Sequence, residues 1–166
     1  MAWTNQDGVT IKFGDERGVA YTSGKNMSSA IKTLTHKFTY ADIGNTDTAA
    51  VDVANTAAIP AGSVILRAYL YVTTAFAGAT AVLDIGLKVA AGTNTDDDGI
   101  DAAVAVTALD AVGDFIVCDG ALVADPTGNL TAVRFTADQY IMTTYDTAAF
   151  TAGAATLVVE YLEVED

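Results

Sequence analysis

Residues 63–74 alternate between two kinds of side chain, and this pattern constrains the fold more than any other feature of the chain. One face would carry Val64, Leu66, Ala68, Leu70 and Val72, and the other Arg67, Tyr69, Tyr71 and Thr73. A period of two is that of a β-strand. After a tip at 75–79, residues 81–90 repeat the pattern, with Leu83, Ile85, Leu87 and Val89 inward and Asp84, Gly86 and Lys88 outward. The two segments predict a hairpin with one face in a core.

The rest of the chain continues in the same style. Further strands are expected at 31–40, 51–53, 115–118, 132–136, 139–145 and 155–164, with a turn at 59–62, an acidic loop at 91–99 and one short helix at 100–109. Many short strands separated by Gly and Asp turns are typical of a β-sandwich or jelly roll. We therefore predict an all-β fold whose core includes Leu66, Leu70, Leu83, Ile85 and Val159.

Charge divides the chain into two parts. Residues 1–40 hold five Lys/Arg and three acids, a net charge of +2, whereas residues 41–166 hold three Lys/Arg and 18 acids, a net charge of −15. Residues 1–30 are polar and rich in glycine, which indicates an extended arm that requires a partner surface. We expect an N-terminal arm and first strand at 1–40 and a sandwich body at 41–166; the alternative is that the arm is an ordinary edge strand of the body.

No residue cluster predicts catalysis, so we expect no enzyme and no cofactor. His36 is the only histidine and Cys118 the only cysteine; this excludes a disulfide within the chain and metal sites built on several histidines. His36 is expected to pack or to face solvent, and Cys118 to be a small buried residue. Residues 94–101 resemble the first half of an EF-hand, but Ala105 stands where the bidentate Glu is required. A solvated acidic loop is the preferred interpretation, with adventitious Ca²⁺ as the alternative.

The composition also limits the partners. A sequence pI near 4.1 argues against nucleic-acid binding by the body. The first residues lack the basic and apolar regions of a signal peptide, and no apolar run approaches the ~20 residues of a membrane span. We expect no membrane partner and synthesis in a host cytoplasm.

Several turn and strand motifs resemble small capsid-associated proteins of tailed bacteriophages, the decoration or cement proteins and head-fibre proteins. The motifs lie within residues 59–161 and read Ile59-Pro-Ala-Gly62, Val72-Thr-Thr-Ala-Phe76, Leu83-Asp-Ile-Gly86, Asp96-Asp-Asp-Gly99, Ala137-Asp-Gln-Tyr-Ile141 and Ala152-Gly-Ala-Ala-Thr-Leu-Val-Val-Glu-Tyr161. The resemblance implies a non-enzymatic virion protein, a homotrimer that binds the major capsid protein on the outside of the head and stabilises the shell.

Two sets of contact residues are expected from charge and side-chain type. The arm would contact the capsid through Trp3, Lys12, Arg17, Lys25 and Lys32. Tyr69 and Tyr71 would lie at the subunit interface, where tyrosine is enriched. The alternative function is a tail- or head-fibre module that binds host glycans, for which Phe76 and Phe150 are the candidate exposed aromatics. A β-sandwich hydrolase is a third class that no nucleophile or His/acid signature supports.

Overall fold

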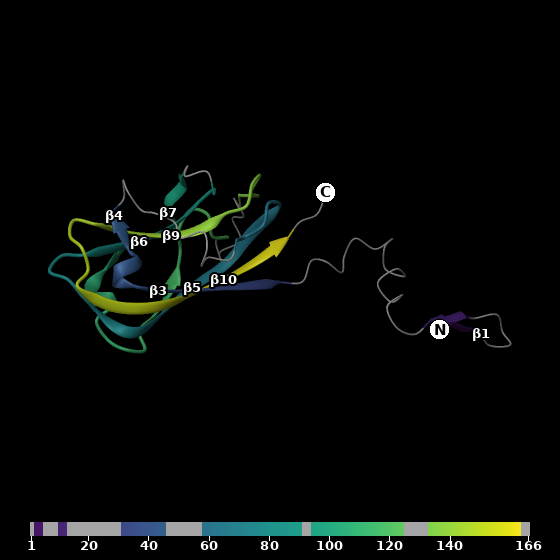
Figure 1. Ribbon diagram of the computed structural model, residues 1–166, viewed down its shortest axis with the longest axis horizontal. Coiled ribbons are helices and arrows are strands. Elements are labelled where there is room, and N and C mark those ends of the chain that lie inside the picture. The colour runs from purple at the N-terminus through teal and green to yellow at the C-terminus, as the bar shows by residue number, and fades with distance from the viewer. Residues whose placement is uncertain are drawn as a thin grey trace.

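The computed structural model describes residues 2–4, 10–12, 31–45, 58–90, 94–124 and 133–163. It confirms an all-β sandwich. Sheet I has the strand order β3-β10-β5-β8 and sheet II the order β4-β9-β6-β7; the two sheets face each other across the core (Figure 1). Among the described residues, no helix is long and apolar enough to cross a membrane.

The strands of sheet I are β3 (Lys32–Thr39), β5 (Ser63–Ala77), β8 (Phe115–Cys118) and β10 (Ala152–Glu163). All three neighbouring pairs are antiparallel. β10 runs between β3 and β5. β3, which the sequence analysis grouped with the arm, therefore pairs with the last strand of the body. The division into domains at residue 40 stays a prediction.

The strands of sheet II are β4 (Gly44–Asn45), β6 (Val82–Lys88), β7 (Asn94–Ala105) and β9 (Tyr140–Asp146). β6 pairs antiparallel with both β7 and β9, and β4 pairs parallel with β9. Short 3-10 turns, η3 (Tyr40–Asp42) and η4 (Val106–Ala108), follow β3 and β7. A separate two-stranded sheet joins β1 (Ala2–Thr4) to β2 (Thr10–Lys12).

The core lies between the sheets and confirms four of the five predicted core residues. Leu70, Leu83, Ile85 and Val159 are fully buried. The prediction for Leu66 is wrong, because this residue is half-buried and Ile65 takes the core position. The pairing of β5 with β10 shifts register at this point, because Tyr161 lies opposite Ile65 and Glu160 opposite Arg67. This β-bulge leaves Leu66 unpaired and reverses the alternation.

Other expectations for local structure are corrected. The predicted acidic loop and helix at 91–109 are mostly strand β7, which ends in η4. Residues 133–136 form no regular strand. Gly86 and Lys88, predicted to point outward, are buried. The expected strand at 51–53 lies outside the described residues.

Phe76 and Phe150 are buried, so the predicted exposed aromatic tips are wrong. Their rings meet edge to face with centroids 5.3 Å apart. Gly153 makes this packing fit: its φ is +130°, and a Cβ there would collide with the ring of Phe76. Phe76 near the end of β5 and Phe150 just before β10 thus close one end of the core.

Candidate docking face

The outer face of sheet I carries two rows of side chains that cross all four strands. One row contains Lys37, Thr156, Tyr71 and Phe115, and the next contains Thr35, Val158, Tyr69 and Val117. Side chains at these positions are half-buried or exposed, whereas their neighbours along each strand are mostly turned to the core. The face is therefore polar at the β3 edge and apolar at the β8 edge.

The apolar half forms what we call the aromatic ridge, made of Tyr69, Tyr71, Phe115 and Val117. Tyr69 and Phe115 stack with centroids 5.4 Å apart. Tyr71 is 44% exposed, Phe115 59% and Val117 60%. Exposed apolar side chains that adjoin one another mark interaction surfaces more often than isolated ones do. The structure places the predicted interface residues, Tyr69 and Tyr71, on this ridge.

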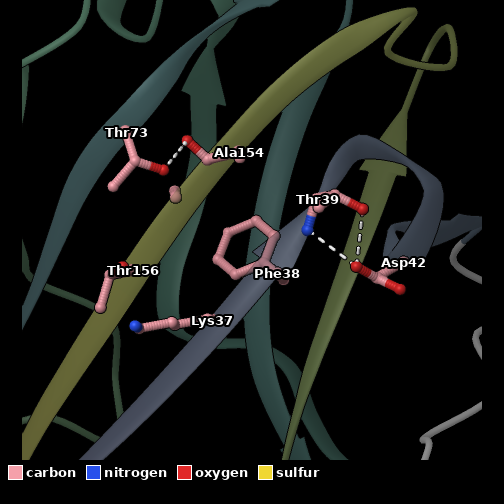
Figure 2. A pocket seen from close by; sticks show the side chains of 8 residues that line it. Lys37, Phe38, Thr39, Asp42, Thr73, Ala154 and Thr156 are labelled. Carbon is pink, nitrogen blue, oxygen red and sulfur yellow. Dashed lines mark hydrogen bonds between the residues drawn. The ribbon is translucent and has the colours of Figure 1, made fainter.

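The polar half contains a hollow of about 380 Å³, shown in Figure 2. Its lining residues come from β3, η3, β5 and β10: Lys37, Phe38, Thr39, Asp42, Thr73, Ala154, Ala155 and Thr156. Both the backbone N–H and the hydroxyl of Thr39 donate to Asp42 Oδ2, at 2.8 and 2.7 Å. The Thr73 hydroxyl donates to the Ala154 carbonyl at 3.1 Å. These bonds fix the walls of the hollow.

Lys37 contributes a positive charge to the rim of the hollow. Its side chain extends beside Thr156 of the neighbouring strand (Figure 2). Within the described part of the chain Lys37 forms no ion pair. The other cation on this face is paired: Arg67 Nε with Glu160 Oε2 at 3.1 Å. Lys32, whose cross-strand partner is the buried Tyr161, lies on the core-facing side of β3 and pairs with Glu163.

Sheet II is acidic where sheet I is close to neutral. Its strands carry six aspartates: Asp84, Asp96, Asp97, Asp98, Asp101 and Asp146. Burial raises the pKa of Asp84, Asp96 and Asp101, and neighbouring aspartates add to the shift. The excess negative charge therefore gathers on the opposite sheet from the aromatic ridge.

Three of these aspartates are the residues compared with a calcium loop. Ligand atoms of Asp96, Asp97 and Asp98 lie within 4.8 Å of one another, close enough to hold a metal ion. They belong to strand β7, however, and not to a loop between helices. The EF-hand comparison therefore fails on backbone geometry as well as on the missing Glu.

The single cysteine and histidine both pack in the protein. Cys118 is buried, as predicted. Burial, together with the adjacent Asp101 carboxylate, raises the pKa of its thiol, so the nucleophilic thiolate is suppressed. His36 is half-buried and stacks on Phe38 with ring centroids 5.9 Å apart. Burial lowers the pKa of His36, against an opposing effect of Asp42.

The predicted capsid-contacting residues are only partly described. Trp3 and Lys12 belong to the strands β1 and β2, but their side chains lie outside the description, as do Arg17 and Lys25 entirely. Lys32 lies on β3 beside Glu163. The sequence analysis missed Phe115, Val117 and the hollow. The period of two within β8 could have located Phe115 and Val117, because it places them on the other face of the strand from the buried Cys118.

Chains of phage capsid structures share this fold. A chain in the acidic stable capsid structure of Helicobacter pylori bacteriophage KHP30 has a TM-score of 0.53 and 15% sequence identity, covering 81% of this chain and 89% of that chain. A chain in the capsid of Ralstonia phage GP4 has a TM-score of 0.52 and 16% identity, covering 85% and 89%. No protein-family model matches the sequence, and no curated protein matches it. At these identities the similarity establishes the fold.

Proposed function

We propose that the chain is a non-enzymatic cement protein, a homotrimer that binds the outside of a phage capsid and stabilises it. The observation that carries the proposal is the fold, which chains of two phage capsid structures share over more than four fifths of this chain. A protein that binds the assembled shell but not free subunits stabilises the shell by mass action. Such a role requires complementary surfaces and no reacting groups.

The distribution of charge supports a two-sided function of this kind. Sheet II, with its aspartates, suits a surface that faces solvent and keeps neighbouring copies soluble. Sheet I, with paired charges and the aromatic ridge, suits contact with protein. Tyr69 and Tyr71 would then lie between subunits, which leaves the arm to reach the shell.

The arm is the proposed capsid contact. Residues 1–40 carry a net charge of +2 against −15 in residues 41–166, which orients the approach to an acidic surface. Residues 1–30 alone hold three cations and three acids, so Lys32 and Lys37 of β3 supply the excess positive charge. Lys12, Arg17, Lys25 and Lys32 would provide this attraction, and Trp3 would provide an apolar anchor of the kind that dominates interface energies. The electrostatic part must weaken with salt, because the Debye length falls from about 10 Å at 0.1 M to about 3 Å at 1 M.

Co-sedimentation tests the function and the arm separately. The full chain and a variant lacking residues 1–30 are each mixed with capsids assembled from the major capsid protein of the same virus. The full chain should pellet with capsids and the truncated chain should not. Failure of the full chain to pellet would refute the cement function, whereas unchanged affinity of the truncated chain would refute only the role of the arm.

The alternative function, a fibre module that recognises glycans, is tested by mixing the chain with host cells. The aromatic residues that would have served this function, Phe76 and Phe150, are buried in the core. No other observation favours glycan recognition. Pelleting of the chain with host cells and not with capsids would reverse the assignment.

A further inference from the structure

We infer that the aromatic ridge of one copy docks into the hollow of the next copy, so that the β8 edge of each subunit meets the β3 edge of its neighbour. This inference rests on the proposed homotrimer and specifies which surfaces hold it together. It is carried by charge complementarity, by shape and by the position of both features on a single sheet.

Charge complementarity distinguishes the two edges of sheet I. Residues 110–119, which contain β8, hold Asp110, Asp114 and Asp119 and no cation. At the β3 edge Lys32 is already paired with Glu163, and Asp42 at the hollow accepts two hydrogen bonds from Thr39, whereas Lys37 forms no ion pair within the described part of the chain. Two copies of an acidic chain repel each other in most orientations. Contact between the β8 edge of one copy and the β3 edge of another instead brings these acids to Lys37.

Shape distinguishes the same two edges. Phe115 and Val117 project from β8 with more than half of their surface exposed, whereas the β3 side of the face contains the hollow of about 380 Å³. One face of the Phe115 ring is stacked on Tyr69. In this contact Lys37, which forms no ion pair within its own described chain, would face Asp119, which follows Val117 on the exposed side of β8.

Position determines the kind of assembly. Among the strands that the structure describes, β3 and β8 are the two opposite edges of sheet I. A contact between different surfaces of identical subunits is heterologous, and it produces a ring when the rotation closes. With a rotation of a third of a turn, three copies each give a ridge and receive one, so that no ridge is left exposed.

A charge exchange between Lys37 and Asp119 tests the contact. Both side chains are exposed, so neither substitution removes core packing. Using multi-angle light scattering at tens of micromolar protein (a concentration at which weak oligomers form), we expect a trimer for the wild type and about tenfold weaker association for Lys37→Glu and for Asp119→Lys. The double variant should recover association, because the opposite charges again face each other across the contact.

Two further variants complete the design. Val117→Glu should dissociate the trimer, whereas Ala105→Glu, which adds the same charge at an exposed position at the end of β7, should leave it intact. Circular dichroism verifies that each variant is folded. If Val117→Glu does not fold, the charge exchange decides the question alone.

A wild type that is monomeric or a two-fold dimer, or a double variant that stays dissociated, would overturn the inference. Capsid pelleting of the same variants is scored separately. A chain that pellets with capsids but does not trimerise refutes the ridge contact and keeps the cement function. A chain that trimerises but does not pellet with capsids refutes the cement function and keeps the ridge contact.

Discussion

Leu70→Ala and Leu66→Ala form a matched pair that tests the register of β5. Both are leucines on the same strand, and strict alternation places both in the core. In the structure Leu70 is fully buried opposite Leu157, while Leu66 is half-buried at the bulge. Equal substitutions should therefore have unequal effects on the free energy of unfolding.

The expected magnitudes follow from the burial of the two side chains. Leu70→Ala removes three buried carbons, worth about 2.4 kcal/mol at about 0.8 kcal/mol each. The cavity left between the sheets brings the loss to about 3 kcal/mol, within the usual range of about 2–5 kcal/mol. Leu66→Ala should cost about 1 kcal/mol, because its side chain is partly in water in the folded state and leaves little cavity.

Urea denaturation followed by far-ultraviolet circular dichroism measures both values. Protein concentration must be the same for all samples, because self-association adds to the apparent stability. Equal losses for the two variants would refute the bulge and restore the uninterrupted alternation. A spectrum dominated by helix would refute the sandwich itself.

Three further predictions concern the other sheet and the end of the core. Burial raises the pKa of Asp84, Asp96 and Asp101, so the folded chain binds protons more tightly there than the unfolded chain. The contribution of these groups to stability is therefore complete below their ordinary pKa and is lost as pH rises through the folded pKa. The amide oxygen of Asp84→Asn can still accept from the Ala103 N–H, so this variant should lose less free energy of unfolding than the wild type between pH 4 and pH 7. Urea melts measure that loss, and an equal loss in the two proteins contradicts the prediction. Cys118 is buried with a raised thiol pKa and should react with a thiol reagent only after denaturation; fast labelling of the native protein would disagree. Gly153→Ala should destabilise the fold through its φ of +130° and the collision with Phe76, and an unchanged urea midpoint would contradict that packing.

The fold class was predictable because the regular strands carry a clear period of two. The strands at 63–77, 82–88 and 152–163 each bury alternate apolar residues for most of their length, and burial on one face fixes this pattern. The position of a bulge has no comparable signal. For that reason Ile65 and Leu66 exchanged places relative to the prediction.

β7 shows why the edge of a sheet is harder to predict. Its sequence is rich in Asp and Ala, residues that are uncommon in strands. Its pairing with β6 shifts register several times, and Ala103 has a φ of +57°. These irregularities place buried Ile100 and Val104 four residues apart, which is the spacing of a helix. This spacing is compatible with the predicted helix at 100–109, although the structure forms a strand there.

The docking face was predictable only in part. The outward orientation of Tyr69 and Tyr71 was predictable because they lie on the polar side of a regular strand, while their place at a subunit interface stays a prediction. The hollow is built by residues from β3, η3, β5 and β10, which only the folded chain brings together. Charge counts distinguished residues 1–40 from residues 41–166, but the difference between sheet I and sheet II depends on which strands pair.

The cement function is tested most directly by cryo-electron microscopy of capsids incubated with the full chain and compared with capsids alone. We predict added density outside the shell at sites shared by neighbouring capsomers, with three sandwiches around each site and the outer face of sheet II turned to solvent. Capsids without added density, or density on the inner surface of the shell, would contradict the proposed function.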